Sequence, residues 1–136
     1  MKKRELAKYS GVPVWNGLTD DYHPTQILAD FLTLREQFGE IKGLNFVFAG
    51  DGRNNMSNSL MIGCSKMGLN FTCLAPKSLW PNEELVKQCE EYAKESGAKI
   101  RFTEDVKEAV EGADCITQTY GHLWVKKTRQ QKELLY

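Results

Sequence analysis

Apolar residues along the chain alternate between helical spacing and short continuous runs. Where they recur three and four positions apart, they predict amphipathic helices with one buried face. Short apolar runs without that spacing are typical of strands that are buried on both faces. The predicted helices span residues 24–39, 54–68, 81–97 and 104–112. The predicted strands span residues 44–50, 69–76, 98–103 and 113–117.

The predicted helices and strands alternate, and this order indicates a parallel sheet with helices on both faces. We therefore expect the α/β class, with three α/β/α layers and a parallel sheet of about four strands. Ligands of such sheets bind beyond the carboxyl ends of the strands. Two segments occupy that position, AGDGRNN after the first strand and LAPK after the second. The pattern breaks after Thr117, because residues 118–136 are polar, basic and weakly periodic.

Charge and cysteine content narrow the class of protein. The 18 basic and 18 acidic side chains cancel, so no overall field attracts nucleic acid or an acidic membrane surface. No apolar run is long enough for a membrane span, and the first residues lack the apolar segment of a signal peptide. The four cysteines form no CxxC pair, which favours buried thiols in a reducing cytoplasm over a disulfide or zinc framework. We expect a cytoplasmic protein with no metal and no cofactor.

The turn GDGRNN, residues 50–55, is the first candidate site. It fails the dinucleotide fingerprint, because Asn55 takes the place of the third glycine and no carboxylate ends the second strand. It also lacks the G-K-[ST] of a phosphate loop. Two interpretations stay open: a tight turn with Asn54 as the helix cap, or an amide pair that holds an amino-acid-like ligand through its donors and acceptors.

The segment HPTQ, residues 23–26, is the second candidate. His23 and Gln26 lie three positions apart, so in a helix they face the same way. A histidine can polarise a carbonyl group, and a glutamine amide can bond to the same group. The alternative is a plain helix start with an exposed histidine. His122 receives no role, and Trp15, Trp80 and Trp124 are expected to be packing residues.

Taken together, these motifs resemble a known family. HPTQILADFLTLRE, then FAGDGRNNMSNSLMIGCSKMGLNFTCLAPKSLWP, then TEDVKEAVEGAD, are similar to the ornithine-binding half of an ornithine carbamoyltransferase over about residues 5–117. The resemblance implies a Rossmann-like fold and the transfer of a carbamoyl group from carbamoyl phosphate to ornithine, which yields citrulline and phosphate in arginine metabolism. It further implies trimers of a two-domain subunit, with the site between the domains.

The resemblance also implies roles for three residues. His23 and Gln26 match the family positions that bind carbamoyl phosphate at its carbamoyl end, and they are the expected catalytic residues. Asn55 matches the second asparagine of the family turn, which contacts ornithine. The expected domains are a partial ornithine-binding domain at residues 1–117 and a non-family tail at residues 118–136.

Three family motifs are not found among the 136 residues: the S-x-R-T phosphate loop, D-x-W-x-S-M-G after the fourth strand, and H-C-L-P. We therefore expect the isolated chain to be inactive or nearly so. The codons for residues 118–126, read in an offset frame, can encode T-D-V-W-A-S-M-G-E. This match predicts that a frameshift produced the tail.

Two other functions stay open at this level. One is a non-catalytic module that binds an amino acid, and the other is a carbamoyltransferase that acts on putrescine or another amine. The asparagine pair fits an α-amino acid better than putrescine. Nucleotide binding is a fourth hypothesis and has little support, because the fingerprint fails.

Overall fold

A computed structural model of the chain describes residues 3–119. Its helices are α1 (Lys3–Tyr9), α2 (Pro24–Phe38), α3 (Asn55–Met67), α4 (Glu83–Ser96) and α5 (Val106–Val110), with a 3-10 helix, η1 (Lys77–Leu79). Its strands are β1 (Asn45–Ala49), β2 (Asn70–Leu74), β3 (Ile100–Thr103) and β4 (Cys115–Gln118). Every predicted helix and strand is confirmed, with ends that shift by a few residues. Helix α1 and η1 were not predicted. Within the described residues, no helix is long and apolar enough to cross a membrane.

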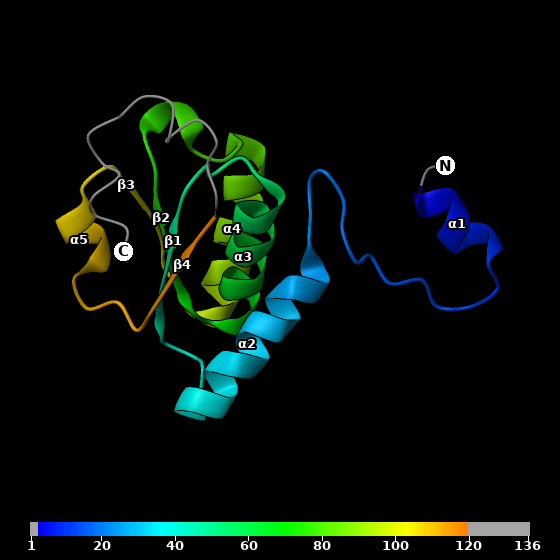
Figure 1. Ribbon diagram of the computed structural model, residues 1–136, viewed down its shortest axis with the longest axis horizontal. Coiled ribbons are helices and arrows are strands. Elements are labelled where there is room, and N and C mark those ends of the chain that lie inside the picture. The colour runs from blue at the N-terminus through cyan, green and yellow to red at the C-terminus, as the bar shows by residue number, and fades with distance from the viewer. Residues whose placement is uncertain (1–2, 120–136) are drawn as a thin grey trace.

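The four strands form one parallel sheet in the order β3-β2-β1-β4 (Figure 1). In the register, Phe48 of β1 lies between Cys73 of β2 and Thr117 of β4. All strands point the same way, so the turns that follow β1 and β2 and the end of β4 lie at one edge of the sheet. This edge is where the sequence places the candidate turn at residues 50–55.

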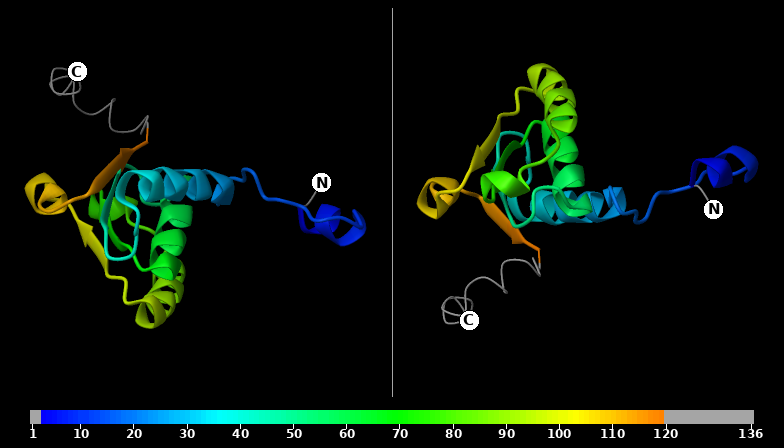
Figure 2. Two further views of the ribbon diagram at one scale, coloured as in Figure 1. Left: turned by 90° about the horizontal axis from the view of Figure 1, so that it is seen from below. Right: turned by 90° about the horizontal axis from the view of Figure 1, so that it is seen from above.

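Helices cover both faces of the sheet, so the predicted three-layer α/β architecture is confirmed (Figure 2). Helices α2, α3 and α4 cover one face, and α5 covers the other. Side chains of β1 alternate between the faces, with Phe46 and Phe48 toward the three helices and Val47 toward α5. Most of the core therefore lies on the three-helix side. Its largest fully buried side chains are Phe46, Phe48, Phe71, Leu60, Met61 and Leu69.

The helix ends on this side have the capping residues that the sequence predicts. Asn54 and Asn82 cap the starts of α3 and α4, and each side chain accepts a hydrogen bond from a backbone N–H of the first turn. Gly68 and Gly97 end these helices in left-handed conformation, with φ of 80° and 85°. An L side chain would be strained there, so glycine is the residue that allows the turn toward the next strand.

An N-terminal arm, residues 3–15, extends away from the sheet and its helices (Figure 1). Residues 5–15 are exposed except for the half-buried Ser10, and this explains why α1 has no apolar stripe in the sequence. The predicted packing role of Trp15 is wrong, because its side chain is 77% exposed on this extended segment. Trp80 does pack, with its ring centroid 5.6 Å from that of Phe102 and its Nε1 donating to the Ala75 carbonyl over 2.8 Å. Trp124 and His122 lie outside the described residues.

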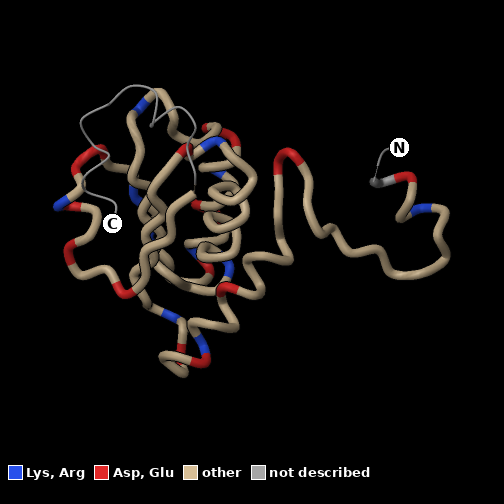
Figure 3. The backbone as a smooth tube through the Cα atoms, in the orientation of Figure 1, with Lys and Arg blue, Asp and Glu red and all other residues tan. Residues whose placement is uncertain are grey.

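Positions of acidic and basic residues are interspersed along the backbone (Figure 3). This distribution agrees with the formal net charge of zero.

Candidate functional site

Two glycines of the β1–α3 turn lie where no side chain would fit. A Cβ on Gly52 would be 2.6 Å from the Leu79 carbonyl oxygen and 2.9 Å from the Cys73 sulfur. A Cβ on Gly50 would be 2.8 Å from the Thr119 hydroxyl. The double glycine therefore serves close packing of the turn against η1 and the end of β4, and it requires no bound phosphate.

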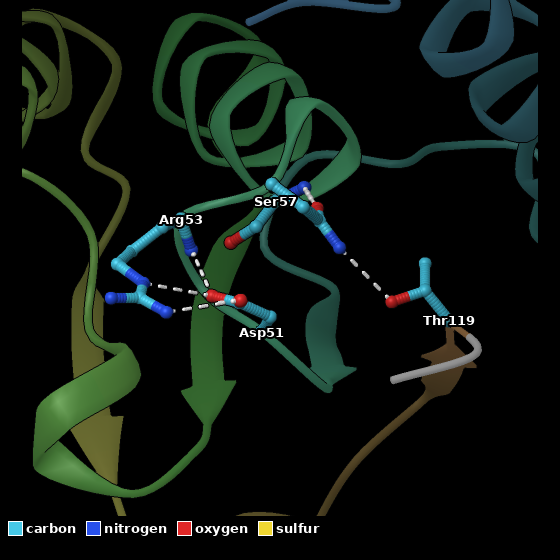
Figure 4. Close-up of polar contacts among 5 residues, drawn as sticks. Asp51, Arg53, Ser57 and Thr119 are labelled. Atoms are coloured by element: carbon cyan, nitrogen blue, oxygen red, sulfur yellow. Dashed lines mark hydrogen bonds and ion pairs between the residues drawn. The ribbon is translucent and has the colours of Figure 1, made fainter. Parts of the chain in front are cut away.

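Asp51 and Arg53, which flank Gly52, form an ion pair within the turn (Figure 4). The Arg53 backbone N–H and Nε donate to Asp51 Oδ1 over 2.9 Å and 3.2 Å. Partial burial raises the pKa of the Asp51 carboxyl, but the hydrogen bonds and charge of Arg53 outweigh it, so the pKa lies below its usual value. Asp51 is therefore an ionised, paired residue of the turn.

Asn54 uses both ends of its amide within the protein. Its Oδ1 accepts from the Ser57 backbone N–H over 2.8 Å, and its Nδ2 donates to Thr119 Oγ1 over 3.1 Å. The helix-cap interpretation of Asn54 is thus confirmed. Asn54 also ties the start of α3 to the residue that follows β4.

Asn55 is half-buried, and its amide points to a different segment. Its Nδ2 donates to the Thr19 carbonyl over 2.8 Å, across 36 positions of sequence. The side chain thereby links the GDGRNN turn to the segment that leads into HPTQ. The role in ornithine binding stays a prediction.

His23 lies at the start of α2 as its N-cap residue, with φ of −135° and ψ of 64°. Its backbone N–H donates to Ser59 Oγ over 2.8 Å, and its Nδ1 lies 3.5 Å from Thr25 Oγ1. Gln26 is exposed and donates from Nε2 to Asp30 Oδ1 over 2.9 Å, one turn along α2. In this structure the two side chains therefore have different partners, and neither role in carbamoyl phosphate binding is tested by it.

Sequence reasoning missed Asn58 and Ser59, which join Asn55 in holding the segment before α2. Asn58 Nδ2 donates to the Asp21 carbonyl over 3.1 Å. A signal existed, because positions 55, 58 and 59 are three and four apart and lie on one side of a helix. The structure thus brings His23 and Asn55 to opposite ends of one helical turn of α3.

An open apolar groove lies between α2 and α3. Its volume is about 720 Å³, and its lining includes Ile27, Phe31 and Ile62. Leu28 and Leu32 on its rim are 59% and 58% exposed. The outer side of α2 is therefore an uncovered apolar surface.

The cysteines are free thiols, as predicted. Cys64, Cys73 and Cys89 are buried, and Cys115 is half-buried. Burial raises the pKa of all four thiols, that of Cys73 to about 11. Such thiols are protonated at neutral pH and are poor nucleophiles. Among residues 3–119, no group of three His, Cys, Asp or Glu side chains is placed to hold a metal ion.

Two family models match the chain on either side of the end of α2. Residues 42–135 match "Aspartate/ornithine carbamoyltransferase, Asp/Orn binding domain", and residues 1–36 match "Aspartate/ornithine carbamoyltransferase, carbamoyl-P binding domain". The boundary between the two matches, at residues 37–41, lies inside the range predicted as one partial domain, residues 1–117. The first match also runs through most of the predicted non-family tail. The predicted domain limits and the frameshift stay predictions.

Curated relatives agree with the predicted resemblance. The chain is 61% identical over 121 residues to "Ornithine carbamoyltransferase, catabolic" of Mycoplasma capricolum subsp. capripneumoniae, covering 89% of this chain and 38% of that protein. It is 54% identical over 131 residues to the enzyme of the same name from Streptococcus ratti, covering 96% and 38%. The chain therefore spans under two fifths of the length of these relatives.

Solved structures give the same result. The ornithine carbamoyltransferase from Gloeobacter violaceus superposes with a TM-score of 0.83 at 36% identity, over 90% of this chain and 43% of that one. The enzyme from Pyrococcus furiosus does so with a TM-score of 0.82 at 38% identity, over 96% and 41%. The fold, the two motifs and the matched models lead to one conclusion, that the chain belongs to the aspartate/ornithine carbamoyltransferase family.

Proposed function

We propose that the chain is part of an ornithine carbamoyltransferase, which transfers the carbamoyl group of carbamoyl phosphate to ornithine and releases citrulline and phosphate. One observation carries the proposal: α3 joins the HPTQ and GDGRNN motifs through hydrogen bonds at both ends of one helical turn. The names of the curated relatives support ornithine over other amines. We further propose that the enzyme works in the cytoplasm as a trimer.

In the proposed reaction, the side-chain amine of ornithine attacks the carbamoyl carbon, and the bond from that carbon to the phosphate oxygen breaks. We assign His23 and Gln26 to the carbamoyl end of carbamoyl phosphate, where nitrogen donors stabilise charge that develops on the carbonyl oxygen. Asn55 is assigned to ornithine, because an amide provides a donor and an acceptor to a zwitterion. Catalysis of this kind depends mainly on holding the two substrates in line.

The isolated chain is expected to form citrulline only at a trace rate. The S-x-R-T motif that binds the phosphate group in the family is not among its 136 residues, and neither is the D-x-W-x-S-M-G motif. Positioning of two substrates requires both motifs. A colorimetric citrulline assay on the purified chain measures this, and turnover at the rate of the Streptococcus ratti enzyme would contradict it.

A chimera tests the assignment of residues. Residues 19–117 of this chain replace the matching segment of the Mycoplasma capricolum enzyme, and citrulline is measured with ornithine or putrescine as the acceptor. We expect activity with ornithine, and a loss of about 10²–10³ in kcat for His23→Ala, as is typical when one transition-state donor is removed. Asn55→Ala should raise the KM for ornithine. Lys94→Ala, on the exposed face of α4, is the control.

Three results would contradict the proposal. Preference for putrescine would assign the site to another amine. Unchanged kinetics in both the His23 and Asn55 variants would remove these residues from the site. Ornithine binding by calorimetry without any citrulline formation in the chimera would favour the non-catalytic amino-acid-binding module.

The origin of residues 118–136 is a separate proposal. We propose that a single-base deletion after the Cys115 codon shifted the frame. Sequencing of the gene past its stop codon should show an offset frame that reads D-V-W-x-S-M-G-E and later H-C-L-P. An offset frame without these motifs would show that the tail is the original sequence.

A further inference from the structure

Three polar side chains on α3 hold the chain segment that leads into His23. All three bonds run from side chains of α3 to backbone groups of residues 19–23. They are Asn55 Nδ2 to the Thr19 carbonyl at 2.8 Å, Asn58 Nδ2 to the Asp21 carbonyl at 3.1 Å, and the His23 N–H to Ser59 Oγ at 2.8 Å. The segment therefore contacts α3 at every second residue, through its backbone.

The held segment is already a closed turn. The Thr19 backbone N–H donates to the Tyr22 carbonyl over 2.7 Å, and the Tyr22 N–H donates to Thr19 Oγ1 over 2.8 Å. Residues 19–22 thus have their own internal bonds, and α3 adds the bonds that place the turn. A change in the α3 side chains should therefore shift the turn as a unit, together with His23 behind it.

The helix that holds the turn is one of the most deeply buried parts of the molecule. Leu60 and Met61, which follow Ser59 directly, are fully buried in the core. Ser59 itself is only 6% exposed, so water cannot readily replace its hydroxyl as the acceptor for the His23 N–H. The stripe of Asn55, Asn58 and Ser59 thus joins a rigid element to a surface turn.

We propose that Asn58 and Ser59 are positioning residues, which fix His23 relative to Asn55. The inference rests on the proposed function, in which His23 serves carbamoyl phosphate and Asn55 serves ornithine. Asn55 and Ser59 are one helical turn apart, so the two substrate residues share one anchor. A displacement of about 1 Å in such a site can lower the rate about 10²-fold. Asn58 and Ser59 therefore act on the reaction through His23, without touching substrate.

Amide hydrogen exchange on the 136-residue chain, followed by NMR, tests the positioning directly. Ser59→Ala should speed exchange of the His23 amide about tenfold, because that N–H loses its acceptor, while amides of β1 and α4 keep their rates. Ser59→Thr retains the hydroxyl and should restore protection. Ser57→Ala is the matched control, a buried serine of the same helix that bonds none of residues 19–23.

Asn58→Ala covers the case in which the Ser59 variant fails to fold. Asn58 is half-buried, so its loss leaves no core cavity, and it should speed exchange of the Tyr22 and His23 amides. Unchanged protection of residues 19–23 in both variants would overturn the proposal. An equal effect of Ser57→Ala would overturn it as well, because that would be general loosening of α3.

Carbamoyl phosphate kinetics in the chimera, which supplies the S-x-R-T motif of the family, separate a positioning role from a structural one. We expect the KM for carbamoyl phosphate to rise about fivefold or more in Ser59→Ala and to return toward the parent value in Ser59→Thr. An equal KM in the chimera and its Ser59→Ala variant would overturn the proposal. Unchanged kinetics of His23→Ala in the same chimera would contradict the proposed role of His23, while the exchange rates would still decide whether α3 positions it.

Discussion

The two faces of the sheet differ sharply in how much they bury. On the three-helix face, β1 contributes Phe46 and Phe48 to a cluster that reaches from α2 through α4 to β2. On the α5 face, the buried cluster among residues 3–119 consists of Val47, Leu74 and Ala109. Side chains that belong to this second face, such as Val106 of α5 and Ile116 of β4, remain 58% and 55% exposed.

This difference in burial indicates which part of the fold can hold a site rigidly. Resistance to local opening follows buried apolar contact, so α3 should open only with the whole domain, whereas the five-residue α5 should open alone. The residues that place His23 and Asn55 all lie on α3. The candidate site therefore takes its rigidity from the three-helix face, and the α5 face contributes little to it.

The largest expected effect comes from the same substitution made on each face. Leu60→Ala, at a fully buried position of the three-helix face, should destabilise the chain by about 4 kcal/mol, because a packed site cannot collapse around the cavity. Leu74→Ala, 9% exposed on the α5 face, should cost about 2 kcal/mol. Urea unfolding followed by circular dichroism measures both. Equal losses would show that the faces are packed alike.

Alkaline pH should lower the stability of the chain through thiols that are buried on the three-helix face. The buried thiols Cys64, Cys73 and Cys89 all lie in its cluster. Burial raises the pKa of Cys73 to about 11 from an ordinary value of 9.0. The unfolded thiol thus ionises first, so its contribution to stability is complete below pH 9 and declines toward pH 11, by on the order of 2–3 kcal/mol.

The measurement for this prediction is the free energy of unfolding at several pH values between 8 and about 11. Cys73→Ala removes the titrating group, so it should unfold with a shallower dependence on pH than the parent chain. Other groups that titrate in this range are common to both chains, so the difference in slope isolates Cys73. Identical slopes would contradict the prediction.

The smallest expected loss of stability comes from removing one helix cap on each face. Asn54→Ala should cost about 1–2 kcal/mol, because it removes both the cap of α3 and the bond to Thr119. Asp105 caps α5 by accepting from the Glu108 N–H over 3.0 Å, yet Asp105→Ala should cost about 0.5 kcal/mol, since α5 can fray without exposing much core. Thermal unfolding of the two variants measures both losses of stability. A larger loss for Asp105→Ala would assign α5 a central role in stability.

Much of the fold could be predicted because its signals are local. Helix α3 begins after Asn54 and ends at Gly68, and both residues act through bonds to their own helix. Helix α1 had no such signal, because its exposed residues carry no apolar stripe. Trp15 was expected to pack, since a large aromatic residue usually gains from burial, but its side chain on the extended arm is 77% exposed.

The site could be predicted only in part. Motif matching selected His23, Gln26 and Asn55, and the structure brings His23 and Asn55 to opposite ends of one helical turn of α3. It did not reveal that Asn54 also bonds to Thr119, or that Gln26 reaches along its own helix to Asp30. Those outcomes depend on which partners lie within about 3 Å, and spacing along the chain does not contain that information.

The sequence by itself determined the alternation of helices and strands, the helix caps and the resemblance to carbamoyltransferases. These features depend on local periodicity, on capping chemistry and on motifs read along the chain. Only the tertiary structure decided the strand order, the unequal cover of the two faces, and the stripe on α3 that holds the turn before His23. Each of these joins residues that are far apart in the sequence, and such contacts form only when burial of the whole core offsets the entropy of closing the loops between them.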